Sequence, residues 1–301
     1  MNAQASARLE QYRQACRIHG GTFNLCAASL GVKLSRIPIP SRWLRERVYR
    51  TLYGKKYKSL NEGELDRPLA DFKSLNELFT RGLRPECRPI PRAPSQWLCP
   101  CDSTVQDVGQ LHENTLLTVK GIEYSLESLL PDVNAERFRN GRFAIFFLSP
   151  ADCHRVFAAS AGLIHEISHV PGRRLLVHPP YQRQEFPVFT LNERVIIRMT
   201  THFGDCVLVL VAGWGVGNIT HPFDVPLRLS RRRITRHEFT PPRAVEPGEW
   251  IATFELGSTV ILITERHDGI APAVLREQQV VYGQPAFTLP AREGEAACPA
   301  T

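Results

Sequence analysis

Short apolar segments rich in β-branched and aromatic residues follow one another from about residue 100 onward, and they restrict the folds that this chain can adopt. Proline and glycine separate the segments, at Pro171-Gly172, at 213–217 and at Pro247-Gly248. This alternation is typical of the strands and turns of a β-sandwich or a barrel-like core. We expect strands at 143–148, 163–170, 195–200, 207–211, 250–254 and 260–264.

Residues 1–90 differ from this pattern because they are basic and helical in character. Ser41 can cap a helix in which Leu44, Val48 and Leu52 recur at every fourth position. The other faces of that helix carry basic residues, namely Arg42, Arg45, Arg47, Arg50, Lys55 and Lys56. Such a cationic amphipathic helix can dock on an anionic membrane surface. An ordinary helix with a solvated basic face fits the same pattern equally well.

A second helix is expected at 75–83, where Ser74 and Glu77 have the spacing of a capping box. The chain is therefore predicted to be an α+β protein, with an N-terminal helical segment followed by a β-rich sandwich or barrel-like core. Its expected parts are a basic helical membrane-docking region (1–90), a β-rich domain (91–290) and a loose tail (291–301).

Composition and charge narrow the class of protein further. The 301 residues are 43% hydrophobic and 22% charged, which excludes a largely disordered chain. The longest apolar runs, near 143–148 and 207–216, are too short for a membrane-spanning helix. Residues 1–16 are polar and lack the apolar core of a secretory signal, so we expect a cytoplasmic protein. The net charge of +7 suggests an anionic partner, either nucleic acid or acidic lipid.

Two sequence patterns could bind a metal, and we expect neither to do so. Cys99 and Cys101 form a C-x-C pair, but no second pair follows at zinc-site spacing, and the eight cysteines are expected to be reduced thiols. His165 and His169 match the H-E-x-x-H motif of zinc proteases, which requires a helix. Their segment fits a short strand better, and on a strand the two histidines would lie about 13 Å apart.

A Gly257-Ser258 pair between two strand-like runs allows three interpretations. Ser258 can be a turn residue, the nucleophile of a hydrolase, or the site of self-cleavage. The G-x-S-x-G pattern of α/β-hydrolases is absent there, which disfavours the second interpretation. In the third, the Ser258 hydroxyl attacks the preceding carbonyl and converts the amide to an ester. Elimination from that ester leaves dehydroalanine and then an N-terminal pyruvoyl group.

Several motifs in one order favour the third interpretation. Residues 254–261 resemble F-x-L-G-S-T-V-I, 100–105 resemble P-x-D-G-x-V, 120–130 resemble K-G-x-x-Y-S-L-x-x-L-L, and 148–157 resemble L-S-P-x-D-Y-H-R-V-H. Weaker matches lie at 75–81, 192–195 and 216–219. Over residues 40–287 the chain thus resembles the phosphatidylserine decarboxylase family.

The resemblance implies a proenzyme that cuts itself between Gly257 and Ser258 into a large chain (1–257) and a small chain (258–301), which stay together as a heterodimer. The pyruvoyl group formed from Ser258 would be the cofactor, with no metal required. It would form a Schiff base with phosphatidylserine and yield phosphatidylethanolamine after loss of CO2. The partners implied are phosphatidylserine and the anionic lipid surface at the cytoplasmic face of the cell membrane, where the protein would be peripheral. No nucleic acid is implied.

The family's self-cleavage uses an Asp-His-Ser set, of which Asp102 and Ser258 are present and the histidine is replaced by Phe157. Phenylalanine cannot accept a proton, so either another base acts or processing is slow or absent. His154 matches the family histidine implied in decarboxylation and is one substitute base. His202, which stands where the family has a glutamate, is a second.

Three hypotheses therefore remain open. The first is a pyruvoyl-dependent phosphatidylserine decarboxylase. The second is an unprocessed, catalytically inactive lipid-binding relative, for which Phe157 is the argument. The third is a serine hydrolase that uses Ser258, His154 and Asp102.

Overall fold

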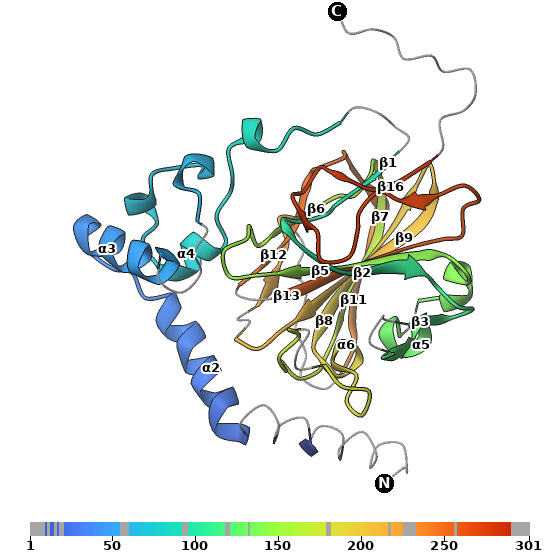
Figure 1. Cartoon of the computed structure of the whole chain (residues 1–301), viewed down its shortest axis with the longest axis horizontal. Helices are drawn as coiled ribbons and strands as arrows, with labels where there is room; N and C mark the ends of the chain where they lie inside the picture. The colour runs from blue at the N-terminus through green and yellow to red at the C-terminus, as the bar shows by residue number, and fades with distance from the viewer. Residues whose placement is uncertain are drawn as a thin grey trace, which may run out of the picture.

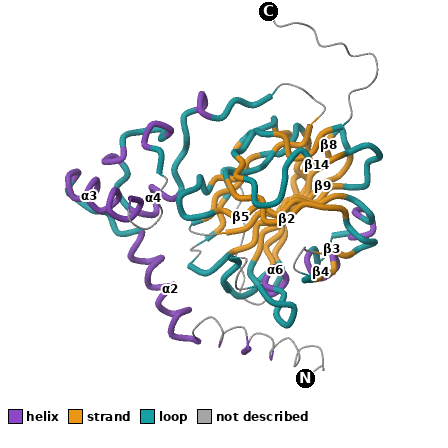
Figure 2. The backbone as a smooth tube through the Cα atoms, viewed as in Figure 1, coloured by secondary structure: helices purple, strands orange, loops and turns teal. Residues whose placement is uncertain are grey.

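The structure is a computed structural model of an α+β protein in which helices precede a large antiparallel β core (Figure 1). This confirms the predicted fold class. The residues that the structure describes are 10, 13–14, 17, 21–54, 60–91, 96–117, 121–131, 133–178, 182–215, 218–224, 233–255 and 258–289. The helices of the N-terminal region gather on one side of the core (Figure 2).

The N-terminal region contains the helices α2 (Gly21–Ser35), α3 (Arg42–Leu52) and α4 (Leu75–Phe79). Ser41 caps α3 by accepting a hydrogen bond from Leu44 N at 3.4 Å. Ser74 caps α4 through Glu77 N at 3.2 Å, so the predicted start of this helix is confirmed. The helix ends at Phe79 rather than at residue 83.

Most of the apolar stripe of α3 packs inside the protein, whereas the membrane-docking interpretation expected it to face lipid. Val48 and Leu52 pack against a small core that contains Tyr49, Tyr53 and Phe72. The sequence pattern alone could not distinguish a lipid surface from this internal partner, because both bury the same face of the helix. Of the predicted stripe, Leu44 remains exposed.

One eight-stranded sheet forms the centre of the molecule, in the order β11-β7-β8-β9-β13-β5-β2-β15, with every neighbouring pair antiparallel. The six predicted strands are all present, with bounds within a few residues of those expected. Five of them belong to this sheet, and the strand at 250–254 belongs to a smaller sheet. The strands are β2 (Ser103–Gln110), β5 (Arg142–Leu148), β7 (Gly162–Val170), β8 (Arg194–Thr201), β9 (Gly204–Ala212), β11 (Thr235–Val245), β13 (Ser258–Thr264) and β15 (Gln279–Val280).

Smaller elements cover the two faces of this sheet. On one face lie two three-stranded sheets, built from β1 (Gln96–Leu98), β16 (Pro285–Thr288) and β14 (Ala271–Pro272), and from β10 (Ile219–Thr220), β12 (Trp250–Phe254) and β6 (Arg155–Phe157). On the other lie α5 (Leu126–Leu129), α6 (Val188–Leu191) and their loops, while β3 (Thr115–Leu117) pairs with β4 (Glu123–Ser125).

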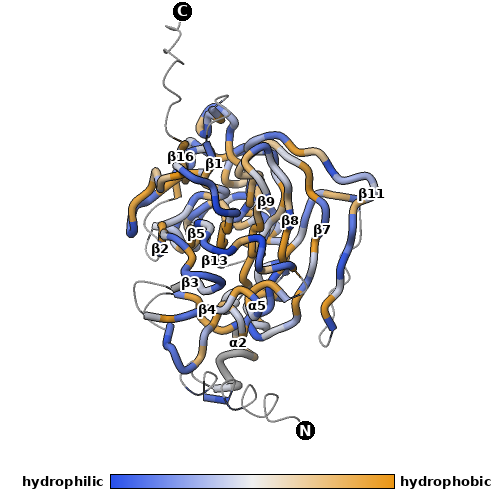
Figure 3. The backbone as a smooth tube through the Cα atoms, turned by 90° about the vertical axis from the view of Figure 1, so that its right-hand side faces the viewer, coloured by the Kyte–Doolittle hydropathy of each residue, from blue (hydrophilic) through white to orange (hydrophobic). Residues whose placement is uncertain are grey.

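Alternate residues of the central strands fill the two resulting cores. Val260 and Leu262 of β13 face the three-stranded sheets, whereas Ile261 and Ile263 face α5 and α6. Strands buried on both faces carry continuous apolar runs, as β13 does at 260–263 between its polar ends. The edge strand β11 mixes polar and apolar residues instead (Figure 3).

The H-E-x-x-H segment lies on β7, which confirms that it is a strand. His165 bonds Thr200 Oγ1 through Nε2 at 2.9 Å, and His169 bonds Glu193 Oε1 through Nε2 at 3.1 Å. The two imidazoles therefore form hydrogen bonds with different partners. Among the described residues, no helix is long and apolar enough to cross a bilayer.

A buried arginine joins the N-terminal region to the β core. The guanidinium of Arg88 donates to Asp102 Oδ2 at 2.7 Å and Oδ1 at 3.1 Å, and also to Glu64 Oε2 at 2.8 Å. Asp102 Oδ1 accepts a further bond from Tyr282 N at 3.0 Å. Asp102 thus connects three segments that are distant along the chain, and its charge is compensated inside the protein.

Arg88→Met is expected to destabilise the protein by about 3–5 kcal/mol, because it leaves the Asp102 carboxylate buried without its counter-ion. Urea unfolding measures the loss. Adding Asp102→Asn should recover part of it, since a neutral amide oxygen can still accept from Tyr282 N. A loss below about 1 kcal/mol for Arg88→Met would contradict the structural role assigned to this ion pair.

Candidate active site

Ser258 is the first residue of β13 and is held from both sides. It pairs with Leu148 at the end of β5 and with Ala212 at the end of β9. Its side chain is fully buried. Gly257, the other half of the predicted cleavage site, lies outside the described residues, but its neighbours Glu255 and Ser258 lie within them.

Three chain connections meet at this end of the sheet. Residues 149–153 lead from Leu148 to His154, residues 213–218 lead from Ala212 to Ile219, and residues 255–257 lead from Phe254 to Ser258. The far ends of the three connections also meet, because Phe254 pairs with Ile219 and donates its N–H to His154 O at 2.9 Å. The backbone therefore brings His154 to the connection that carries the Gly257-Ser258 bond.

The imidazole of His154 has one nitrogen fixed and one nitrogen available. Nδ1 lies 2.9 Å from the backbone carbonyl of Asp152, and a carbonyl can only accept, so Nδ1 carries the hydrogen. Nε2 is then the unprotonated nitrogen, and it is buried with no hydrogen-bond partner among the described residues. Phe79 of α4 packs against the ring, with centroids 5.2 Å apart. A backbone carbonyl thus orients this histidine.

Ser258 points into the space between the central sheet and the smaller sheets, and His154 lies directly before β6 of one of those smaller sheets. Val260 and Val156, each two positions after one of them, belong to the core that fills this space. Side chains two positions apart share a side of an extended strand. The Ser258 hydroxyl, like His154 Nε2, is buried without a hydrogen-bond partner among the described residues. The site therefore holds an unpaired donor and an unpaired acceptor.

Burial, and to a smaller extent the nearby Arg81 cation, lower the pKa of His154 to about 3. A lowered pKa means that the imidazole stays neutral from weakly acidic to basic pH. Neutral imidazole with a free Nε2 is the form that can accept a proton from a hydroxyl.

Asp102 and Phe157 lie together, as the resemblance implies, but without an imidazole. The Phe157 ring stacks on Tyr282 with centroids 3.7 Å apart, and Tyr282 N binds Asp102. Arg88 occupies both oxygens of the Asp102 carboxylate. The catalytic role of Asp102 stays a prediction, and the contacts that it makes are those of a buried ion pair.

His202 lies far from Ser258. It occupies the turn between β8 and β9, next to Gly204, whereas Ser258 pairs with Ala212 at the other end of β9. Eight residue steps along a strand span about 26 Å. His202 cannot accept a proton from Ser258 over this distance, so His154 is the remaining substitute base.

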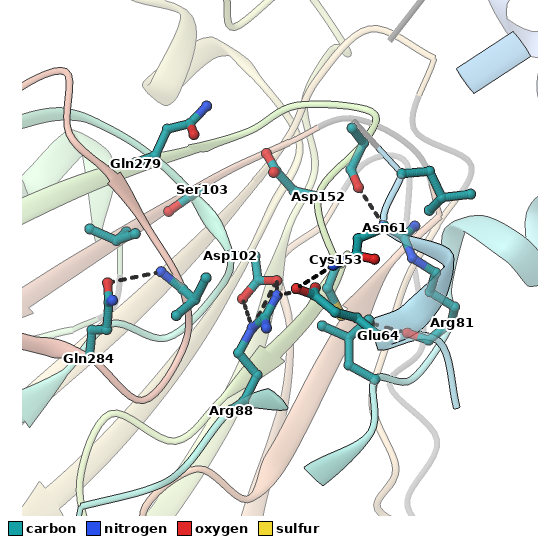
Figure 4. A pocket seen from close by; sticks show the side chains of 15 residues that line it. Asn61, Glu64, Arg81, Arg88, Asp102, Ser103, Asp152, Cys153, Gln279 and Gln284 are labelled. Carbon is teal, nitrogen blue, oxygen red and sulfur yellow. Dashed lines mark hydrogen bonds and ion pairs between the residues drawn. The ribbon is translucent and has the colours of Figure 1, made fainter. Parts of the chain in front are cut away.

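A polar cavity of about 240 Å³ lies on the Asp102 side of the site (Figure 4). It is lined from the N-terminal region by Asn61, Glu64 and Arg81, and from the core by residues that include Asp102, Asp152 and Cys153. Neither His154 nor Ser258 lines it, although Cys153 precedes His154 directly. Burial raises the pKa of Asp152. The cavity thus borders Asp102, whereas the Ser258 side of the site does not open onto it.

The sequence motifs did not assign some of these residues to the site. Arg88 and Tyr282, the partners of Asp102, lie 14 and 180 positions from it along the chain. Phe79, which packs on His154, reads in the sequence as an ordinary apolar residue of α4. Only the three-dimensional contacts assign these side chains to the site.

Comparison with known proteins agrees with this geometry. The family model described as phosphatidylserine decarboxylase matches residues 75–288. The chain is 39% identical to the phosphatidylserine decarboxylase proenzyme of Halorhodospira halophila, over 74% of this chain and 76% of the relative. The identity to the proenzyme of Bordetella petrii is 34%, over 76% of this chain and 80% of the relative. The identity to the proenzyme of Escherichia coli O9:H4 is 35%, over 73% of this chain and 70% of the relative. The match includes the strands that position Ser258 and His154, and the chain therefore belongs to the phosphatidylserine decarboxylase family of carboxy-lyases.

Proposed function

We propose that this chain decarboxylates phosphatidylserine to phosphatidylethanolamine with a pyruvoyl group that it makes by cutting itself between Gly257 and Ser258. The observation that carries the proposal is that Ser258 Oγ and His154 Nε2, at one end of the sheet, are both buried without a hydrogen-bond partner among the described residues. What distinguishes Ser258 from the other buried hydroxyls of this kind is its place directly after Gly257, whose carbonyl its hydroxyl would attack.

In the proposed cleavage, Ser258 Oγ attacks the Gly257 carbonyl while His154 Nε2 takes the hydroxyl proton. The C–N bond of the peptide breaks, the nitrogen of residue 258 receives a proton, and an ester joins the two residues. Loss of the Ser258 Cα proton then expels the Gly257 carboxylate and leaves dehydroalanine. Water replaces the nitrogen, ammonia departs, and a ketone remains at the start of the small chain.

The surroundings of Ser258 fit a group attached to the chain at this position. Pairing with β5 and β9 holds residue 258 on both sides, so the new N-terminus would keep its place after the bond breaks. The ketone supplies an electrophile that condenses with the substrate amine and accepts the electrons released as CO2 leaves. His154, neutral and enclosed, would hold or return a proton beside it.

The proposal includes two chains that remain one heterodimer. The small chain would supply β13 at the centre of the eight-stranded sheet, together with β14, β15 and β16. The pairing of residues 259–264 with β5 and β9 does not involve the nitrogen of residue 258, which the proposed reaction removes. The small chain should therefore dissociate only on unfolding.

One observation favours the unprocessed alternative. The Phe157 ring and the Arg88 guanidinium fill the surroundings of Asp102, where the family uses a histidine. A relative that has lost cleavage could keep such a closed, well-packed arrangement. The experiments below separate the two possibilities.

We also propose peripheral binding to the cytoplasmic face of the cell membrane. Four apolar side chains of the N-terminal region are more than half exposed, namely Leu30, Leu34, Ile37 and Trp43. Basic residues lie among them, including Arg36 and Arg42. Apolar side chains can enter the headgroup zone of an anionic bilayer while arginines contact its phosphates. Phe79 of the same region touches His154, so this surface is connected to the site.

Purified protein is expected to contain two chains, with a small chain that begins at residue 258 and is blocked to Edman sequencing. Ser258→Ala should remain a single chain, because no hydroxyl is present to attack Gly257. Thr264→Ala is the matched control, since Thr264 is a buried, unpaired hydroxyl at the other end of β13. Denaturing electrophoresis reads the result, and an intact wild-type chain would support the unprocessed alternative.

His154→Ala is expected to slow cleavage by about 10²–10⁴-fold, the usual contribution of a general base. Phe157→His should speed cleavage if the new imidazole replaces Arg88 as a hydrogen-bond partner of Asp102. The pKa of about 3 predicts a wild-type cleavage rate that does not fall between pH 8 and pH 5, because His154 stays neutral over that range. Time courses of precursor disappearance test all three statements. Normal cleavage by His154→Ala would rule out His154 as the base.

Salt-sensitive binding to vesicles that contain anionic lipid is expected, with screening over about 10 Å at 0.1 M salt. Leu34→Ser with Ile37→Ser should weaken binding in a vesicle sedimentation assay, because two apolar side chains no longer enter the bilayer. Leu275→Ser is the matched control, since Leu275 is an apolar side chain that is even more exposed than Leu34 and Ile37 but lies in the C-terminal part of the chain. Equal binding by both variants would contradict the proposed surface.

A further inference from the structure

The segment immediately before the proposed cleavage bond is tied to the N-terminal region by an ion pair. Arg36 Nη2 contacts Glu255 Oε2, across 219 positions of sequence. Glu255 lies three residues before Ser258, and its side chain is mostly buried. The contact therefore links the residue that follows α2 to the segment just before the proposed cleavage bond.

Both partners are themselves anchored. Glu255 N donates to Asn218 O at 2.9 Å, which fixes the backbone of Glu255 on the connection that follows β9. Arg36 follows α2 directly, and its N–H donates to Lys33 O at 3.3 Å. Three residues later, Ile39 N donates to Lys73 O at 2.7 Å, just before α4. The ion pair thus joins two segments that are each held by backbone hydrogen bonds.

Only Leu256 and Gly257 separate Glu255 from Ser258. The downstream side of the bond is held by β13, which pairs with strands on both sides. The upstream side is held through Glu255, which donates a backbone hydrogen bond to Asn218 and forms an ion pair with Arg36. Attack on a carbonyl requires the two reacting atoms to be about 3 Å apart and aligned, so freedom on either side of the bond slows the reaction.

We infer that Arg36 is a positioning residue for self-cleavage: by binding Glu255, it restrains the upstream side of the Gly257-Ser258 bond. After the cut, the same contact retains Glu255 of the large chain beside the N-terminal region. This inference rests on the proposed function, because it concerns the bond that the proposal expects to break.

The test follows precursor disappearance after pulse-labelled synthesis of the full chain. Arg36→Gln and Glu255→Gln should each slow cleavage by about three- to ten-fold, given the strength of a partly exposed ion pair and the effect of misalignment. The double variant should be no slower than either single variant, since both remove one contact. The reversed pair, Arg36→Glu with Glu255→Arg, should recover most of the wild-type rate.

Arg67→Gln is the matched control, because Arg67 forms an ion pair with Glu77 at 3.8 Å in the same region and does not contact the cleavage segment in the described residues. Its cleavage rate should equal that of the wild type. To separate positioning from a loss of folding, each substitution is repeated in the Ser258→Ala protein, where the thermal unfolding midpoint should not change.

Cleavage of Arg36→Gln at the wild-type rate, or a reversed pair as slow as the single variants, would overturn the inference while leaving the proposed function intact. A wild-type chain that never cleaves would instead refute the proposed function and this inference with it. The two failures are therefore distinguishable on the same gel.

Discussion

The pairing of β13 between β5 and β9 is the constraint on which the rest of the site depends. It fixes Ser258 at the point where the strand begins and aims its hydroxyl into a closed space. The same pairing brings the ends of three connections together, and one of them carries His154. Within the part of the chain that the structure describes, the Ser258 hydroxyl and His154 Nε2 are buried there without hydrogen-bond partners, at a cost of about 1–3 kcal/mol each.

Phe157 stands where the resemblance implies a histidine, so Asp102 has no imidazole partner at this position. Asp102 has a charged partner in Arg88 and a backbone partner in Tyr282, so its carboxylate remains satisfied. His154 is oriented by the Asp152 carbonyl, a neutral acceptor that fixes the tautomer. A carbonyl stabilises a developing imidazolium less than a carboxylate does, so a base held in this way should be weaker than a base in an Asp-His pair.

The sequence allowed the fold class and the main strands to be predicted, because alternating turns and β-branched runs report local structure directly. It also brought out Ser258 and His154, through motifs that are continuous in the chain. It did not reveal Arg88, Tyr282 or the Arg36–Glu255 contact, since these depend on segments that only the fold brings together. The apolar stripe of α3 was ambiguous for a related reason: the pattern defines a buried face but not what covers it.

The central claim is that Ser258 becomes a ketone at the start of the small chain, and its most direct test is chemical. The purified protein is treated with ammonia and cyanoborohydride, which converts a pyruvoyl group into alanine, and the small chain is then sequenced from its N-terminus. The account predicts a chain that is blocked before treatment and reads Ala, Thr, Val, Ile after it, in line with Thr259, Val260 and Ile261. A free serine at the first position, or an intact 301-residue chain, would contradict it.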